Sequence, residues 1–303
     1  MTPILLFGCD GQVGWQLQRS LSPLGTVTAV NRAQCDLANP EAIRSAIQAV
    51  APKIIVNAAA YTAVDRAETE PELAQAINAT APGVMAEAAK KSGALLVHYS
   101  TDYVFDGSKQ APYVETDPTC PLSVYGRTKR DGEDAVVAAG CRALVFRTSW
   151  VFGARGNNFV KTVLRLAGEG RALRIVDDQV GAPTPAAMIS DVTGQVLAAS
   201  RRGAQIEDCR LYHLTADGDV SWCGFAREIL RLGALTPGFE GLPAPDSVTG
   251  IGTADYPTPA KRPANSRLDC GKLERDFDLE LPDWRPFLSR MLQLLALKRA
   301  NGY

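Results

Sequence analysis

In the first half of the chain, short apolar runs alternate with longer segments of helical periodicity. The apolar runs, which predict strands, cover residues 4–7, 27–30, 54–56, 95–99 and 144–146. The segments with helical spacing cover residues 13–21, 40–50, 71–91 and 124–139. Pro40 and Pro71 stand where a first helical turn tolerates proline. This alternation predicts a parallel sheet with crossover helices, which is the doubly wound, Rossmann-type α/β fold.

The second half of the chain is less regular. Its predicted strands cover 173–176 and 211–214, and its predicted helices cover 157–168, 185–200, 221–232 and 284–300. Residues 235–267 are rich in proline and glycine and predict a long loop region of the kind that often carries function. We expect an NAD(P)-binding Rossmann domain over residues 1–155, joined by part of 175–215. A smaller, mainly substrate-binding domain is expected over 156–303.

Composition and charge narrow the range of functions that the chain could have. The 303 residues carry a net charge of −1, so no nucleic-acid partner is expected. No apolar run is long enough to span a membrane, and the start runs without a basic segment into Gly8, which favours a first strand over a signal peptide. Seven scattered cysteines, no CxxC and only two histidines argue against a metal site and favour free thiols in a reducing cytosol. A cytoplasmic protein is expected.

A glycine pattern, Gly8, Gly11 and Gly14, follows the first predicted strand and opens the first helix. Gly8 permits a tight turn, Gly11 lets a pyrophosphate approach the backbone, and Gly14 lets the helix pack on the strand. The helix N-terminus adds free N–H groups and a positive dipole end. The pattern predicts a dinucleotide site, and the plainer alternative is an ordinary strand-to-helix turn. Asp10 is expected to point to solvent or to cap the helix.

The residues after the second strand bear on the choice of cofactor. Sites selective for NAD place an acidic residue there, whereas this chain has Asn31 and Arg32. Arg32 is suited to a 2′-phosphate, with a solvated loop arginine as the alternative. Asp36 and Leu37 are placed beside the adenine. NADPH is therefore the expected cofactor, and NADH is an alternative that such sites accept.

Candidate catalytic residues follow the fourth strand. Thr101 ends that strand, and Tyr125 and Lys129 lie at positions i and i+4 of a predicted helix, on one face. A phenol has a pKa of about 10, which a nearby ammonium lowers. Thr101 can hydrogen-bond the same substrate oxygen as Tyr125. A Tyr-x-x-x-Lys pair alone is common by chance, but after the glycine loop it predicts a proton donor for hydride transfer to a carbonyl.

These residues, in this order, resemble the extended short-chain dehydrogenase/reductase family and, within it, the family of dTDP-4-dehydrorhamnose reductases. The matching blocks, which extend over nearly the whole chain, are 5–14, 56–65, 100–107, 121–129, 146–152, 178–184 and 256–266. The resemblance implies reduction of the C4 ketone of dTDP-4-dehydro-L-rhamnose to dTDP-L-rhamnose. In this reaction Tyr125 is the acid, Lys129 holds the nicotinamide ribose and tunes Tyr125, and Thr101 orients the ketone.

The pattern and the resemblance together give two residue sets. The expected cofactor-binding residues are Gly8, Gly11, Gln12, Val13, Gly14, Asn31, Arg32, Asp36, Leu37, Ala60, Tyr61, Thr62, Tyr99, Tyr125 and Lys129. The expected substrate-binding residues are Thr101, Asp102, Trp150, Arg262, Asn265 and Ser266. A guanidinium suits a diphosphate, which favours Arg262 at the nucleotide end. For Trp150, a core aromatic is the alternative.

One position departs from the family pattern. Some relatives dimerise through a magnesium ion held by glutamates, and Gln16 replaces one of these glutamates here. We therefore expect no metal and a monomer or weak homodimer.

Two rival functions stay open. The first is another sugar-nucleotide epimerase, dehydratase or reductase on the same fold. The second is a non-catalytic NADP-binding regulatory subunit, such as that of methionine adenosyltransferase, which resembles this family. The intact Thr101, Tyr125 and Lys129 favour an enzyme.

Overall fold

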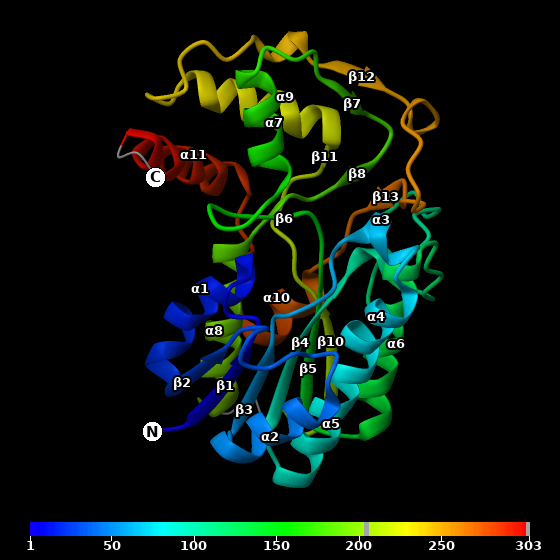
Figure 1. Cartoon of the computed structure of the whole chain (residues 1–303), viewed down its shortest axis with the longest axis vertical. Coiled ribbons are helices and arrows are strands. Elements are labelled where there is room, and N and C mark those ends of the chain that lie inside the picture. The colour runs from blue at the N-terminus through cyan, green and yellow to red at the C-terminus, as the bar shows by residue number, and fades with distance from the viewer. Residues whose placement is uncertain (203–205, 301–303) are drawn as a thin grey trace.

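The computed structural model describes residues 1–202 and 206–300, and a six-stranded parallel sheet forms its lower part (Figure 1). The strands are β1 (Pro3–Phe7), β2 (Thr26–Val30), β3 (Ile54–Asn57), β4 (Leu95–Thr101), β5 (Ala143–Thr148) and β10 (Cys209–His213). Their order is β10-β5-β4-β3-β1-β2, so the winding reverses between β1 and β3. The Rossmann-type fold predicted from the sequence is confirmed.

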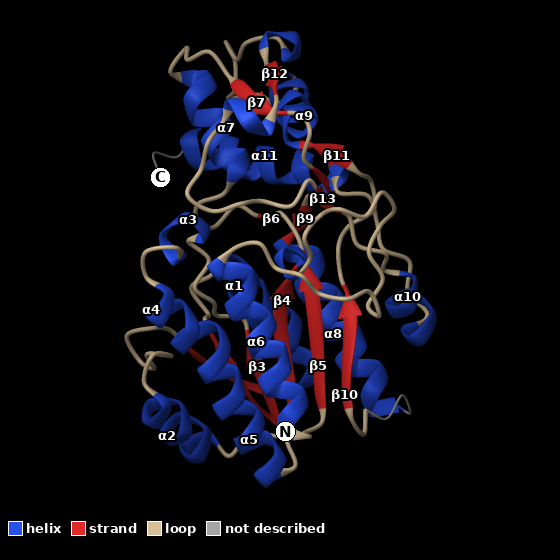
Figure 2. Ribbon diagram, turned by 90° about the vertical axis from the view of Figure 1, so that its right-hand side faces the viewer, coloured by secondary structure: helices blue, strands red, loops and turns tan. Residues whose placement is uncertain are grey.

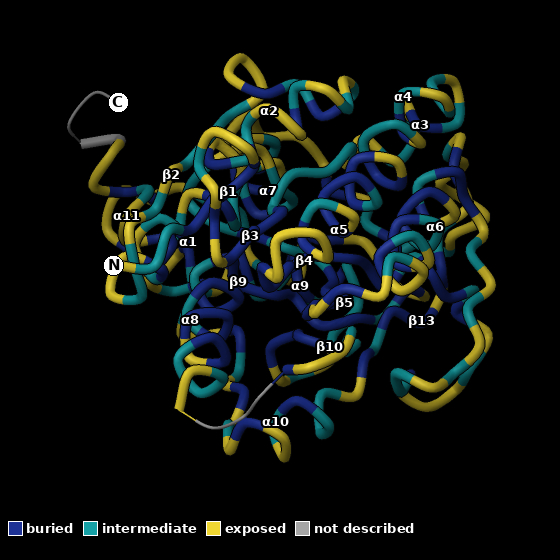
Figure 3. Tube along the Cα trace, turned by 90° about the horizontal axis from the view of Figure 1, so that it is seen from below, coloured by how far each residue is buried: buried dark blue, intermediate teal, exposed yellow. Residues whose placement is uncertain are grey.

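Helices cover both faces of this sheet. On one side α1 (Gln12–Leu21) packs against α8 (Ala186–Arg202) over Ile4 and Leu6 of β1. On the other side α2 (Pro40–Val50), α5 (Ala81–Ser92) and α6 (Val124–Ala139) cover Leu5 and Phe7. Because both faces are covered there, β1, β3, β4 and β5 are buried along nearly their whole length, whereas the edge strand β2 is exposed or half-buried throughout. Seen from below, the central strands β1, β3, β4 and β5 form the buried centre of the molecule (Figure 3).

The segment predicted as one helix over 71–91 is interrupted. It forms α4 (Pro71–Gln75), a π-helical turn at Ala76–Thr80, and then α5. Pro82 gives the reason: it has no N–H for the carbonyl of Asn78, and its ring would clash with that carbonyl in a regular helix. The backbone of Asn78 lies instead against Gly132 of α6, where an added Cβ would be 2.1 Å from the Asn78 oxygen.

The upper part of the molecule lies beyond the carboxyl ends of the strands (Figures 1 and 2). It contains α7 (Phe159–Gly168), α9 (Trp222–Ala234) and α11 (Arg285–Ala300), together with the short pairs β7 (Arg174–Val176) with β12 (Thr249–Ile251) and β6 (Val151–Phe152) with β9 (Thr184–Pro185). A three-stranded sheet joins β11 (Val220–Ser221), β8 (Val180–Gly181) and β13 (Asn265–Ser266).

The structure departs from the sequence prediction in two further respects. Residues 235–267 are not only loop, because they contain β12 and β13, which pair with strands about 75 to 85 positions earlier. Helices α3 (Val64–Ala67) and α10 (Gly271–Phe277) had no periodic signal, since each is at most seven residues long.

In the part of the chain that the structure describes, no helix combines the length and apolarity needed to cross a bilayer.

Candidate active site

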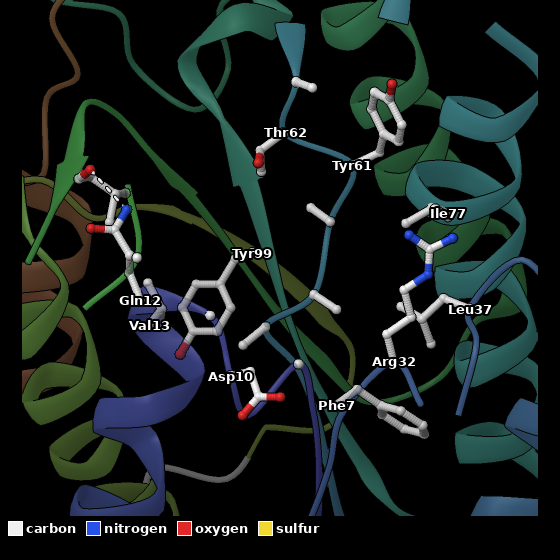
Figure 4. A pocket seen from close by; sticks show the side chains of 18 of the residues that line it. Phe7, Asp10, Gln12, Val13, Arg32, Leu37, Tyr61, Thr62, Ile77 and Tyr99 are labelled. Atoms are coloured by element: carbon white, nitrogen blue, oxygen red, sulfur yellow. Dashed lines mark hydrogen bonds between the residues drawn. The ribbon is translucent and has the colours of Figure 1, made fainter. Parts of the chain in front are cut away.

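A cleft of about 610 Å³ opens above the carboxyl ends of β1 and β3, where the winding of the sheet reverses. Fourteen of the fifteen residues expected to bind the cofactor line it: Gly8, Gly11, Gln12, Val13, Asn31, Arg32, Asp36, Leu37, Ala60, Tyr61, Thr62, Tyr99, Tyr125 and Lys129. In Figure 4, Gln12 and Val13 border one end, and Arg32 and Leu37 lie at the other. The structure therefore brings these residues from five parts of the chain to one elongated cavity.

The glycine loop has the shape that the sequence predicts. Gly8 has a φ of +81°, and a Cβ there would lie 2.7 Å from the backbone of Ala59. Gly14 does not line the cleft; a Cβ on it would lie 2.1 Å from the Gly8 oxygen, so the close packing of α1 on the loop requires glycine. Gly11 is the N-cap of α1 and has no side-chain cap, which leaves the first N–H groups of the helix open to the cleft.

Asp10 does not cap α1. Its side chain is 60% exposed and lies 3.5 Å from a guanidinium nitrogen of Arg155, which also donates a hydrogen bond to the Asp10 backbone oxygen. Of the two alternatives considered from the sequence, the solvent-facing one is observed. The negative charge of the Asp10 carboxylate, beside the glycine loop, is therefore paired with the guanidinium of Arg155.

At the far end of the cleft, the loop after β2 is held by Asn31, whose Oδ1 accepts from the N–H groups of Ala33 and Gln34. The Arg32 side chain is 76% exposed, and its only ion pair in the described chain is a loose one, 3.9 Å from Asp36. This guanidinium is available to an anion in the cleft. Arg66, which sequence reasoning missed, also lines the cleft and is paired with Glu70 at 2.5 Å.

The cofactor-lining segment Ala60–Thr62 is fixed by a residue that was not predicted. Asn78, buried in the π-helical turn, accepts from the Tyr61 N–H at 2.8 Å and donates to the Tyr61 carbonyl at 3.1 Å. It also donates to the hydroxyl of Thr128, next to Lys129. The sequence signal that could have identified Asn78 is a polar residue on the apolar face of the helix predicted over 71–91.

Tyr125 and Lys129 lie on successive turns of α6, whose start is capped by the Ser123 hydroxyl. Lys129 is 1% exposed, and its Nζ donates to the Tyr99 carbonyl at 2.6 Å. Burial lowers the pKa of Lys129 to about 8, against the effect of Glu133, which raises it. Burial raises the pKa of Tyr125 to about 12, while a hydrogen bond with Thr101 lowers it. The lowering of the Tyr125 pKa expected from Lys129 is not observed.

Thr101 and Asp102 form a buried polar pair beside Tyr125. The Thr101 hydroxyl donates to Asp102 Oδ1 at 3.0 Å, while Asp102 Oδ2 is buried without a hydrogen-bond partner. Burial raises the pKa of Asp102 to about 6, and a hydrogen bond with Ser266 opposes this rise. The ring of Tyr103 packs edge-to-face on Tyr125 with centroids 5.4 Å apart. A carbonyl placed here would meet two hydroxyl groups and one carboxyl group.

The other expected substrate residues lie outside the cofactor cleft. Trp150 has a left-handed φ of +48° and stacks on Trp222, with ring centroids 3.5 Å apart. Such strain in a partly exposed aromatic favours a functional position over a plain core position. Arg262 is bound to Asp65 at 2.8 Å, so a diphosphate would have to compete for its guanidinium. The Asn265 amide donates to two backbone carbonyls of the 109–111 loop.

The cleft fits a dinucleotide in one further respect. The hydroxyl groups of Ser100 and Thr148 are buried in its wall and have no partner in the described chain. Buried polar atoms normally have a hydrogen-bond partner, so these two hydroxyls point to a polar ligand.

Among residues 1–202 and 206–300, no cluster of three or more His, Cys, Asp or Glu is placed to hold a metal ion.

Comparison with known proteins agrees with this arrangement. The family model described as "RmlD substrate binding domain" matches residues 1–297. Curated dTDP-4-dehydrorhamnose reductases from Burkholderia thailandensis and Escherichia coli K12 are 49% and 46% identical to the chain; the alignments cover 93% and 96% of this chain and 95% and 97% of the relatives.

Solved structures show the same likeness. The dTDP-4-dehydrorhamnose reductase of Bacillus anthracis, in complex with NADP, superposes with a TM-score of 0.86 at 32% identity, over 96% of this chain and 98% of that one. A UDP-glucose-4-epimerase from Stenotrophomonas maltophila has a TM-score of 0.82 but only 16% identity, over the full length of both chains. The epimerase therefore shares the fold alone.

Proposed function

Because the chain belongs to the dTDP-4-dehydrorhamnose reductase (RmlD) family, we propose that it reduces the C4 ketone of dTDP-4-dehydro-L-rhamnose to dTDP-L-rhamnose with NADPH. The observation that carries the proposal is the position of Tyr125. Its phenol lies with Thr101 and Lys129 where the dinucleotide cleft meets the upper half of the molecule. A ketone at that point can receive a hydride from the cleft and a proton from the phenol.

In this mechanism NADPH supplies the hydride to C4, and the protein supplies the proton. The raised pKa keeps Tyr125 protonated at neutral pH, so that the phenol is ready to donate to the ketone oxygen. The Thr101 hydroxyl, which donates to Asp102 in this structure, would turn to donate to the same oxygen and so hold the carbonyl in line. After transfer, a hydrogen bond from Thr101 would stabilise the tyrosinate until a proton from solvent restores the phenol. The released products are the C4 alcohol and the oxidised cofactor.

The protein's own residues give the cofactor its place. The open N-terminus of α1 at Gly11 would hold the pyrophosphate, and Arg32 would pair with the 2′-phosphate. Lys129 would hold the nicotinamide ribose. The NADP complex of the Bacillus anthracis relative supports this choice, and NADH remains the alternative cofactor.

We further propose that residues 1–155, with α8 and β10, form the cofactor domain and that most of 156–303 binds the sugar nucleotide. Asp102 and Trp150 would face the sugar, and Arg262 with Ser266 would face the nucleotide. Asn265 would shape that end by holding the 109–111 loop. The protein would act in the cytoplasm as a monomer or weak homodimer without a metal bridge, which light scattering with and without Mg²⁺ can test.

The direct test is NADPH consumption with dTDP-4-dehydro-L-rhamnose generated in situ, with the product identified by mass spectrometry and NMR. The expected result is one NADPH consumed for each dTDP-L-rhamnose formed. Turnover of substrate without free NADPH would indicate an epimerase that retains its cofactor. Tight NADPH binding without any turnover would indicate a regulatory subunit.

A further inference from the structure

His98 is a buried ionisable residue that the reaction proposed above does not use. It lies on β4 with no exposed surface, directly beside Asn57 in the register of β3 and β4. Its Nε2 is 3.3 Å from Lys129 Nζ, and its Nδ1 is 3.1 Å from Asn57 Nδ2. A line of contacts therefore runs from Asn57 through the imidazole to Lys129.

The hydrogen bonds of Asn57 decide which nitrogen of His98 carries the proton. Asn57 Oδ1 accepts from the N–H of Ala59 at 3.2 Å, which places the amide nitrogen toward His98. An amide nitrogen only donates, so Nδ1 of the ring must accept. A neutral imidazole has one donor and one acceptor, so Nε2 carries the hydrogen. Burial and the neighbouring Lys129 hold the pKa of His98 well below its usual value, which keeps the ring neutral.

We propose that His98 is a positioning residue for Lys129: Asn57 locks it as the Nε2–H tautomer, and this N–H points at Lys129 Nζ and favours the amine over the ammonium. An amine has one lone pair and two hydrogens. The lone pair accepts from His98, one hydrogen goes to the Tyr99 carbonyl, and the other is left for the cleft. This assignment rests on the proposed function only in giving Lys129 a part in catalysis.

The other charged groups around Lys129 do not replace this contact. Glu133, one turn further along α6, favours the ammonium, but its carboxylate is engaged by Arg147 of β5 in two hydrogen bonds of 2.9 and 2.6 Å. The other ionisable groups of the catalytic site are Tyr125, one turn before Lys129 on α6, and Asp102, which raises the pKa of Tyr125. The pKa of Lys129, about 8, agrees with a site that tolerates the amine, burial being the largest cause.

Nuclear magnetic resonance of the wild-type protein labelled with ¹⁵N-histidine tests the tautomer directly. The chain has only two histidines, and the second one, His213, is an internal reference. Nδ1 of His213 is 3.0 Å from the Tyr113 carbonyl, which only accepts, so His213 is the Nδ1–H tautomer. Two opposite neutral tautomers are expected between pH 6 and 9. An Nδ1–H or a titrating His98 would overturn the proposal, whatever the enzyme's activity.

The Asn57→Asp variant tests the consequence for Lys129. Both carboxylate oxygens accept, one from Ala59 and one from the ring, so His98 should switch to Nδ1–H and offer Nε2 as an acceptor to the ammonium. The upper limb of the pH profile of kcat/KM should then move up by about one to two pH units. The tautomer switch is visible in the same ¹⁵N spectra even without turnover, which separates this test from that of the proposed function.

Two controls separate the tautomer from simpler effects. Thr193→Val removes the 2.7 Å hydrogen bond between Thr193 of α8 and the Tyr99 hydroxyl, a contact that includes neither His98 nor Lys129, and should leave the upper limb of the profile in place. Asn57→Asp in a His98→Phe background keeps the new negative charge without the imidazole, and no shift is expected there. An equal shift in that background would mean that the carboxylate charge acts on Lys129 directly, and the proposal would be wrong.

Discussion

Replacing Tyr125 by phenylalanine tests which group supplies the proton. With a pKa of about 12, only about one Tyr125 phenol in 10⁵ is ionised at pH 7, so the donor is fully loaded in the wild type. Loss of a positioned acid typically costs 10²–10⁴-fold in rate, or about 2.7 to 5.5 kcal/mol of activation free energy. We expect kcat to fall by that factor, while the Kd of NADPH stays within about threefold of the wild type.

Tyr103 provides a matched control for this experiment. Its ring packs on Tyr125 with centroids 5.4 Å apart, so Tyr103→Phe removes a second, half-buried phenol beside the first. Kcat of this variant should remain within about tenfold of the wild type, since the assigned acid is untouched. The assay is single-turnover reduction, with NADPH binding followed by fluorescence. A Tyr125→Phe variant that kept more than about a tenth of kcat, or an equal loss in Tyr103→Phe, would refute the assignment.

Three further predictions follow from the cleft. Burial lowers the pKa of Lys129 to about 8, so the ammonium is lost above that pH and kcat/KM should decline there; Lys129→Met should lower kcat and abolish this limb, and an unchanged profile would exclude the electrostatic role. Arg32 is available to a 2′-phosphate, in a bond worth about 1.5–3 kcal/mol, so NADPH should be preferred about tenfold or more at low salt. Arg32→Ala should weaken NADPH alone, and Asn31→Asp, which keeps the turn acceptor, should favour NADH; an equal loss of both cofactors in kcat/KM would argue against this reading. Gly14→Ala forces a Cβ to 2.1 Å from the Gly8 oxygen and should lower Tm and the yield of folded protein, whereas Gly11→Ala, at 3.3 Å, should weaken NADPH binding with a smaller change in Tm; equal effects of the two in calorimetry would contradict the separate roles.

Much of the cofactor site could be predicted because its signals are local. A glycine that needs a positive φ, a helix start without a cap and a Tyr–Lys pair one turn apart each depend on neighbours within a few residues. Arg66 and Asn78 were missed for the opposite reason. Arg66 is one exposed arginine among many, and Asn78 acts through contacts 17 and 50 residues away.

The upper half shows the same limit more strongly. Strands β12 and β13 are three and two residues long, too short for a periodic pattern, and they exist because β7 and β8 offer partners distant in sequence. The Asp65–Arg262 pair joins residues almost 200 positions apart. No local propensity encodes such pairings, since they form only when the sheet has brought both segments to its carboxyl edge.

By itself, the sequence determined the strands buried on both faces, the helices between them, the glycine loop and the order of the catalytic residues, because hydrophobic burial and backbone sterics act over short stretches of chain. The tertiary structure alone decided the ionisation states in the site. The sequence predicts an ammonium that lowers the pKa of Tyr125, whereas in the structure burial is the main cause of the pKa shifts of both Lys129 and Tyr125. The free energy of a buried charge depends on all atoms that replace water around it, and these atoms come from β3, β4, β5 and α6 together.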